Sequence, residues 1–304
     1  KGNAVRLTDL ARYFAPEREP VAMTYRGNAI YSSAPPASGG SLLAAQLNNL
    51  ERFGVPRALT DDAASLHAAI AAWQLAPSGR GRIADPSLWP VNVEPFISKD
   101  TAAVRWRCYS PSRAITPSMF RGDTLQCAPP SDGKALGTPG DESASSAAAF
   151  AAADAHDDCA GLEHAQGSTC RPQGTTAFTV GDADGNLVAV TQTLGTWGGN
   201  FYVTPGLGFL YNDKLTSYGT DPNQYGARLP FARHGSTLAP TIAFRGVGAA
   251  KRPWFAVGAA GNAWINSAVY QAVLGMSDLG LGPQRALEQP RFLPGQRLGA
   301  SGRE

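Results

Sequence analysis

The segment from residue 175 to residue 193 constrains the fold more than any other part of this 304-residue chain. Residues 176–180 alternate in polarity and predict a strand, and residues 187–193 predict a second one. The Asp-Ala-Asp-Gly-Asn sequence at 182–186 is typical of a tight turn between them. Just upstream, residues 133–157 are rich in Ala, Ser, Gly and Asp and predict a surface loop. Order is therefore expected to return sharply at Thr175.

Other segments predict a mixture of helices and strands. Residues 21–25 and 29–31 flank Arg-Gly-Asn, which is a hairpin signature. From about residue 77 to residue 174 the pattern weakens. Apolar spacing predicts helices at residues 9–13, 41–47, 63–73 and 263–276 and strands at 208–211, 240–244 and 254–258.

The composition is that of an ordinary globular protein, with 43% hydrophobic and 16% charged residues. A net charge of +2 gives no electrostatic reason to expect nucleic acid or an anionic membrane as a partner. No apolar run approaches 18 residues, so no membrane-spanning helix is expected. The chain begins with Lys1 rather than Met, which indicates a processed or trimmed start.

The four cysteines form two pairs that are local in sequence, Cys108 with Cys127 and Cys159 with Cys170. They lack the CxxC spacing of metal clusters and predict two disulfides in an oxidising compartment, periplasmic or secreted, although four unrelated thiols are the alternative. The histidines have no ligand spacing, and no phosphate-binding glycine motif lies between a strand and a helix. No metal and no cofactor are therefore expected.

A threonine that begins a strand directly after a loop can act as a nucleophile. The Thr175 hydroxyl is a poor nucleophile at its free pKa. If the bond between Gly174 and Thr175 is cut, the new α-amine, with a pKa of about 7.7–8, can accept the hydroxyl proton at neutral pH. The alternative is that this Thr simply starts a strand.

Two further segments have both chemical and ordinary interpretations. Gly-Ala-Ala-Gly-Asn at 258–262 leads into a predicted helix, where backbone N–H groups could stabilise an oxyanion. It could equally be a plain strand-to-helix turn. Adjacent hydroxyls at Ser236 and Thr237 can hold a carboxylate, but such residues are more often turn or capping residues.

These segments occur in an order that resembles the gamma-glutamyltranspeptidase family of N-terminal-nucleophile hydrolases. The resemblance runs through nearly the whole chain. Its downstream motifs are Gly-Thr-Thr at 174–176, Asp-Gly-Asn-Leu-Val-Ala-Val-Thr at 184–191, Gly-Phe-Leu-Tyr-Asn at 208–212, Ser-Thr-Leu-Ala-Pro-Thr at 236–241 and Gln-Pro-Arg-Phe at 289–292. Its upstream motifs are Leu-Thr-Asp-Leu at 7–10, Tyr-Arg-Gly at 25–27 and Pro-Pro-Ala-Ser-Gly-Gly at 35–40.

The resemblance implies an α+β fold, a four-layer αββα sandwich made as one precursor. Residues 1–174 would be the C-terminal part of the large subunit, with a loop-rich stretch at 133–174. Residues 175–304 would be the small subunit, and the two would form one structural domain and an internal heterodimer after cleavage. The family's large subunit begins well before the segment matching Lys1, and the end after Phe292 is short. The chain is thus expected to be a fragment or a truncated member, whose exposed sheet face and edge would need another chain to cover them.

The resemblance also implies roles for individual residues. Thr175 attacks the carbonyl of Gly174 to cut the chain, and later attacks a gamma-glutamyl amide to form an acyl-enzyme. Water or an amine acceptor then takes the acyl group. Thr193 matches the threonine that hydrogen-bonds the nucleophile. Gly261 and Asn262 match the Gly-Gly pair of the oxyanion hole.

The substrate-binding positions match the family less well. Ser236 and Thr237 match the pair that holds the substrate α-carboxylate. Gly195 stands where many relatives have a substrate-contacting asparagine, and Lys214 and Ser217 stand where they have a glutamine and an aspartate. Asp213 is close by, but strand alternation predicts that it faces the other way.

Three functions follow from this pattern. The first is a self-processing amide hydrolase or acyltransferase acting on gamma-glutamyl amides such as glutathione. The second is a family member with an altered substrate, such as a cephalosporin or glutaryl side-chain acylase or a biosynthetic enzyme. The third is a non-catalytic binding or scaffold relative.

Overall fold

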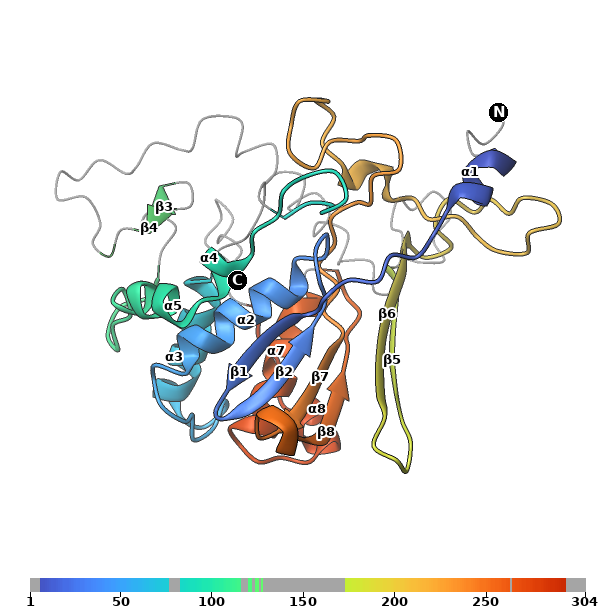
Figure 1. The fold of residues 1–304 in the computed structure, drawn as a ribbon. Helices are drawn as coiled ribbons and strands as arrows, with labels where there is room; N and C mark the ends of the chain where they lie inside the picture. The colour runs from blue at the N-terminus through green and yellow to red at the C-terminus, as the bar shows by residue number, and fades with distance from the viewer. Residues whose placement is uncertain are drawn as a thin grey trace, which may run out of the picture.

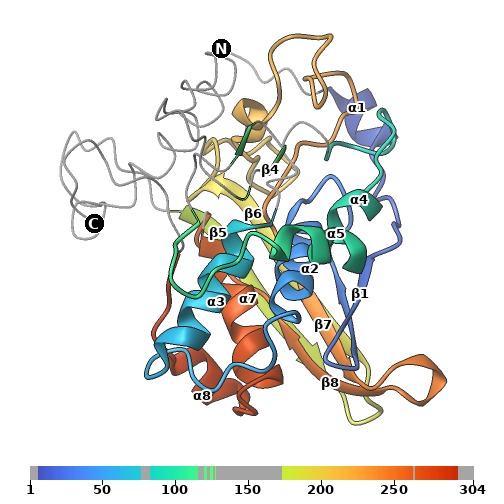
Figure 2. The same cartoon turned by 90° about the vertical axis from the view of Figure 1, so that its left-hand side faces the viewer.

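The computed structural model describes residues 6–76, 83–115, 120–121, 124–125, 127, 173–262 and 264–293. Within them, helices cover one side of a four-stranded sheet, and a long two-stranded hairpin lies on the other side (Figure 1). The view turned by 90° has the helices in front and the hairpin behind the sheet (Figure 2). The described residues are therefore arranged in three layers, helical, sheet and hairpin.

The four-stranded sheet combines strands from distant parts of the chain. Its order is β1 (Val21–Tyr25), β2 (Asn28–Ser32), β7 (Thr241–Arg245), β8 (Arg252–Val257), and all neighbours are antiparallel. The pairing of β2 with β7 brings residues before and after the predicted cleavage point into one ladder. The β1–β2 hairpin confirms the prediction for residues 21–31. Strands β7 and β8 confirm the predictions for residues 240–244 and 254–258.

The helical layer supplies most of the core. It consists of α2 (Gly39–Leu50), α3 (Ala63–Gln74), α7 (Trp264–Ser277) and α8 (Pro283–Glu288). Helices α2 and α7 are buried on nearly every face because they lie against the sheet and against each other. Each fully buried large side chain stabilises the fold by about 1.5–3 kcal/mol. The largest of them are Tyr25, Tyr270, Ile30, Leu43, Leu47 and Leu50.

The predicted hairpin is present as β5 (Gln173–Gly181) and β6 (Leu187–Thr196). One face packs on the sheet, where a Cβ built on Gly258 would lie 2.9 Å from Thr191 Oγ1 and 3.1 Å from Ala177 Cβ. That close approach requires glycine at the end of β8. The opposite face carries large apolar side chains that are about half exposed, Phe178, Val180 and Val188.

One sequence prediction about secondary structure was wrong, and two helices were not predicted. The helices are α4 (Glu94–Ile97) and α5 (Lys99–Trp106), which lie in the weakly patterned stretch after residue 77, and Ser98 caps α5 by accepting a hydrogen bond from Thr101 N. The predicted strand at 208–211 forms only a single bridge, Val203 with Leu210, because its glycines at 206 and 208 adopt positive φ.

Short elements complete the described chain. They are α1 (Leu7–Arg12), β3 (Phe120–Arg121), β4 (Thr124–Leu125) and the 3₁₀ helices η3 (Lys214–Ser217) and η4 (Gly248–Ala250). The predicted surface loop at 133–157 lies outside the described residues.

The predicted disulfide between Cys108 and Cys127 is confirmed, and the second pair, Cys159 and Cys170, lies outside the described residues. None of the helices in the described ranges is long and apolar enough to cross a membrane. The described part of the chain also holds no group of three or more His, Cys, Asp or Glu side chains that could bind a metal ion.

Candidate active site

The candidate nucleophile and its predicted partner face each other across the β5–β6 hairpin. Thr175 pairs with Thr193 in the ladder, and the Thr175 hydroxyl donates a hydrogen bond of 2.9 Å to Thr193 Oγ1. Both side chains are half-buried, on the hairpin face that packs toward β8. The two threonines that the sequence predicts to be catalytic are therefore in direct contact.

A β-bulge lies beside the bond that the sequence predicts to be cut. The register shifts between Gln173 and Thr175. Between these two paired positions β6 contains one residue more than β5. The bulge leaves Gly174 outside regular pairing, and the Thr193 hydroxyl lies 3.4 Å from its carbonyl oxygen. Thr193 also accepts a hydrogen bond of 3.0 Å from the backbone N–H of Gly195. One hydroxyl thus touches the nucleophile and the carbonyl that it would attack.

Gly195 is required by the position of Asp213. It has φ +101°, and a Cβ on it would overlap the Asp213 carboxylate. That carboxylate accepts hydrogen bonds from Thr196 N at 3.2 Å and from Thr196 Oγ1 at 2.5 Å, and the Asp213 N–H donates to Leu194 O. The hydrogen bonds of Asp213 therefore hold the segment before η3 against the end of β6.

The prediction that Asp213 faces away because of strand alternation was wrong. Residue 213 precedes a 3₁₀ helix rather than lying in a strand, so alternation does not apply to it. Its carboxylate points at Thr196 and at the space that a side chain on residue 195 would fill. The glycine at 195 is the sequence signal that could have predicted this contact. A glycine leaves room beside its Cα, and the side chain of an acid close in sequence can occupy that room.

Lys214 lies between two segments of the candidate site. Its Cε is 3.2 Å from the position of a Cβ on Gly195. Burial lowers the pKa of His234, the hydrogen bond to Gly235 O opposes this, and the positive charge of Lys214 lowers the pKa further. The lysine is therefore close to both the end of β6 and the segment that leads to Ser236.

The predicted carboxylate-binding pair and the predicted oxyanion segment meet. Thr237 Oγ1 donates a hydrogen bond of 3.3 Å to the backbone oxygen of Asn262, and Ser236 Oγ accepts one from Leu238 N. Gly261 and Asn262 have φ of +115° and +52° and precede α7, whose first N–H groups bond to their carbonyls. Within the described residues their own N–H groups have no hydrogen-bond partner, so they can serve an oxyanion.

Ser217 lies one turn of η3 from Lys214. Its side chain is exposed and has no hydrogen bond to any described residue. A serine here leaves the position without charge.

A buried acid, which the sequence did not indicate, fixes the segment that carries His234. The side chain of Asp85 is fully buried, and it accepts hydrogen bonds from Arg18 Nη2 at 2.7 Å, Ser87 N at 3.0 Å and Arg233 N at 2.8 Å. Burial raises the pKa of Asp85, but the hydrogen bonds outweigh it and lower the pKa to about 2. Asp85 thus ties the start of the chain to the segment that precedes Ser236.

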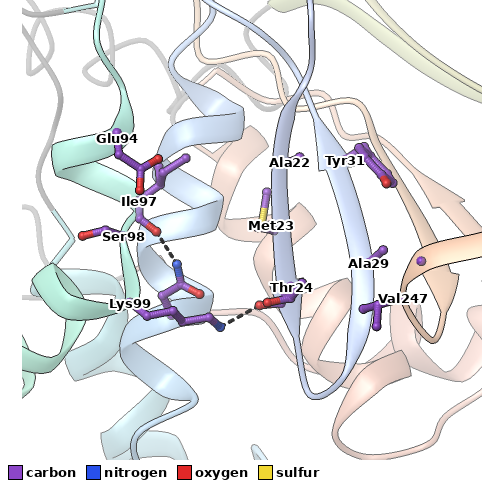
Figure 3. Close-up of a pocket in the computed structure, with 12 residues that line it drawn as sticks. Ala22, Met23, Thr24, Ala29, Tyr31, Glu94, Ile97, Ser98, Lys99 and Val247 are labelled. Carbon is purple, nitrogen blue, oxygen red and sulfur yellow. Dashed lines mark hydrogen bonds between the residues drawn. The ribbon is translucent and has the colours of Figure 1, made fainter.

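A cavity of about 390 Å³ lies elsewhere, over the edge strand β1 (Figure 3). Asn48 lines it and donates to Ile97 O, while Lys99 Nζ donates to Thr24 O at 2.7 Å. None of its lining residues is a predicted site residue, so the cavity does not define the candidate active site.

Thr175 and Thr193 pair on a bulged hairpin, and a glycine-containing turn at 258–262 leads into α7. This geometry agrees with the match of the chain to a protein family. The model of the gamma-glutamyltranspeptidase family matches residues 1–299. The chain belongs to this family. It is 27% identical over 303 residues to a glutathione hydrolase proenzyme of Pseudomonas sp. (strain A14), covering 96% of this chain and 44% of that protein.

Relatives with another named activity are similar to a comparable degree. An acylase ACY 1 proenzyme of Pseudomonas sp. (strain V22) is 26% identical over 291 residues, covering 95% of this chain and 43% of that protein. The crystal structure of a cephalosporin acylase from Bacillus halodurans superposes with a TM-score of 0.65 at 21% identity, over 94% of this chain and 42% of that one. This gamma-glutamyltranspeptidase family chain therefore spans less than half the length of these relatives, and its fold is that of the N-terminal-nucleophile hydrolases.

Proposed function

We propose that this chain is a self-processing amide hydrolase or acyltransferase in which Thr175 is the nucleophile. The observation that carries the proposal is the Thr193 hydroxyl, which lies within hydrogen-bond reach of both Thr175 Oγ1 and the Gly174 carbonyl. Family members named as hydrolase and acylase proenzymes support the same reaction class.

Processing would use the contacts of the continuous strand. Thr175 Oγ1 attacks the carbonyl carbon of Gly174, and Thr193 polarises the carbonyl oxygen by hydrogen bonding. The C–N bond breaks, the hydroxyl proton passes to the leaving α-amine of Thr175, and an ester joins the two residues. Water hydrolyses the ester, which leaves Gly174 with a carboxylate and Thr175 with a free amine.

Turnover would then use the amine that processing frees. The α-amine of Thr175 takes the proton of its own hydroxyl as the oxygen attacks a substrate amide. In this proposal the developing oxyanion accepts hydrogen bonds from the N–H groups of Gly261 and Asn262. The amine of the substrate leaves with a proton, and water or an acceptor amine releases the acyl group from Thr175.

The substrate class rests on the family and on the altered positions. Gamma-glutamyl amides such as glutathione are the first candidates, since a relative is named a glutathione hydrolase. A side-chain acylase or a biosynthetic enzyme is the second, because Gly195, Lys214 and Ser217 replace the residues expected for a gamma-glutamyl group. We further propose the four-layer sandwich, the division at residues 174 and 175, and a periplasmic or secreted location, which the Cys108–Cys127 disulfide supports.

Intact-protein mass spectrometry of the purified chain tests the proposal. Wild-type protein should give two fragments, residues 1–174 and 175–304, and Thr175→Ala should remain whole. Thr176→Ala is the matched control, because this neighbour points to the opposite face of β5 and is exposed, so the variant should still be cut. An uncut wild-type chain would overturn the proposal and favour a binding or scaffold relative.

A further inference from the structure

We infer that Ser33 and Ser38 are positioning residues for the candidate active site. Each hydroxyl holds a backbone carbonyl of the segment at 236–239, and both together fix the Ser236 hydroxyl, which is proposed to bind a substrate carboxylate. Both serines precede the predicted cleavage point, whereas the segment that they hold follows it. The inference rests on the proposed Thr175 acyl-enzyme, and it names the residues that keep the carboxylate-binding segment in place.

The segment at 236–239 lies outside the ladders of the four-stranded sheet. Strand β7 begins only at Thr241, and the bridge that the described residues form with the segment is a parallel one between Ala37 and Ser236. Its carbonyls therefore need hydrogen-bond donors from elsewhere, because a shielded carbonyl without a partner costs stability. Those donors decide where the segment lies.

Ser33 supplies the donor for Leu238. Its Oγ donates a hydrogen bond of 2.8 Å to Leu238 O and accepts one of 3.1 Å from Gly40 N, in the first turn of α2. Leu238 in turn donates its N–H to Ser236 Oγ at 3.3 Å. A single residue, Leu238, thus connects the Ser33 hydroxyl and the start of α2 to the hydroxyl of Ser236.

Ser38 holds the other end of the segment. Ser236 O accepts hydrogen bonds from Ser38 N at 2.7 Å and from Ser38 Oγ at 3.1 Å. The two backbones are in close contact, since a Cβ built on Gly39 would lie 2.7 Å from Thr237 O and closer still to Leu238 O. The residue after Ser38 must therefore be glycine for this contact to form.

These contacts leave the Ser236 hydroxyl able to donate. Ser236 Oγ accepts the Leu238 N–H, and its own O–H donates to none of the residues that the structure describes. Thr237 differs, because its hydroxyl donates to Asn262 O at 3.3 Å. A hydroxyl that accepts an N–H and keeps its proton can donate a charge-assisted hydrogen bond to a carboxylate. The bonds of Ser33 and Ser38 therefore hold such a donor in place.

Two substrates that differ only in the α-carboxylate test the inference: gamma-glutamyl p-nitroanilide and its α-carboxamide analogue. The ratio of kcat/KM for the first over the second should fall about tenfold in Ser33→Ala, through KM rather than kcat, because a charge-assisted hydrogen bond is misplaced. Ser38→Ala should lower the ratio less, about threefold, because the Ser38 N–H still holds Ser236 O. Ser33→Thr keeps the hydroxyl and should restore most of the ratio.

Ser98→Ala is the matched control for a general loss of stability. Ser98 Oγ also accepts a backbone N–H at the start of a helix, but its hydroxyl bonds Thr101 rather than any residue at 236–239. This variant should leave the ratio unchanged. Mass spectrometry should show that Ser33→Ala is cut like the wild type, because the contacts between Thr175 and Thr193 do not include Ser33.

A binding measurement separates failure of this inference from failure of the proposed reaction. Titration of L-glutamate into Thr175→Ala protein, followed by calorimetry, needs no turnover. Glutamate binding that weakens about tenfold on adding Ser33→Ala supports the inference even if no anilide is cleaved.

Four results would overturn the inference. They are absence of glutamate binding by Thr175→Ala protein, equal binding with and without Ser33→Ala, a carboxylate ratio that Ser33→Ala does not change, and a folded Ser33→Ala chain that stays whole while the wild type is cut. If Ser33→Ala does not fold, Ser38→Ala decides instead, and an unchanged ratio in that variant would equally overturn it.

Discussion

Replacing Asp85 by Asn should destabilise the chain in a way that depends on pH. The fully buried carboxylate holds Arg18 and the backbone of Arg233 and Ser87, and its pKa is lowered from the ordinary 3.8 to about 2. Each pKa unit corresponds to about 1.4 kcal/mol, so the charged form stabilises the native state by about 2 kcal/mol at pH 7. Asn keeps the shape but not the charge, so the loss should be about that large.

The sign of the pH dependence follows from the lowered pKa. The folded state binds this proton less readily than the unfolded state, so the stabilisation is present above the unfolded pKa near 3.8. It should fall as the pH drops through the folded pKa of about 2. About half of it should remain at pH 3.

Urea unfolding at pH 7, 5, 4 and 3 measures this prediction. The difference in unfolding free energy between wild type and Asp85→Asn should be constant down to about pH 5 and then shrink. Asp184→Asn, on the exposed turn of the β5–β6 hairpin, is the matched control and should change little. A difference for Asp85 that stays the same from pH 7 to pH 3 would refute the electrostatic explanation.

Two further changes test the site and the disulfide. Gly195→Ala should cost at least about 1–3 kcal/mol by urea unfolding, because φ is +101° and Asp213 fills the space, whereas Gly54→Ala, at φ +100° in open surroundings, should cost measurably less. Equal costs would show that Asp213 is not the obstacle. Cys108→Ser should lower stability by about 3 kcal/mol, the loop-closure value for a sequence separation of 19, and dithiothreitol should lower the wild type at least as far. A variant as stable as the untreated wild type would contradict this.

The local patterns in the sequence were enough for most of the fold. The β5–β6 hairpin, the β1–β2 hairpin and helices α2, α3 and α7 were predicted because alternation and helical spacing arise from the same faces that become buried. Helix α5 was missed because its mean hydropathy is low and one residue, Ala102, is buried in it. The strand expected at 208–211 does not form. Aromatic residues favour strands and led to the prediction, but the glycines beside them bend the backbone.

The site was less accessible from the sequence. The contact between Thr175 and Thr193 follows once a hairpin and its turn are located, because register is then fixed. The positions of Asp213 and Lys214 do not follow, since they depend on a 3₁₀ helix and on a tertiary contact with Gly195. Asp85 was not found at all, because its partners, Arg18 and Arg233, are brought to it from distant parts of the chain only by folding.

The ladder between β2 and β7 changes what unfolding means for this chain. Before the proposed cleavage at Gly174, the two strands of that ladder belong to one molecule, and refolding is a first-order process. After the proposed cleavage the same ladder would join two polypeptides, so reassembly would become second-order and depend on concentration. Dilute processed protein would then fail to recover after denaturant is removed, although its native contacts are unchanged. The processed protein would then hold a structure that it reaches only when folding precedes cleavage, so its unfolding at low concentration would be irreversible.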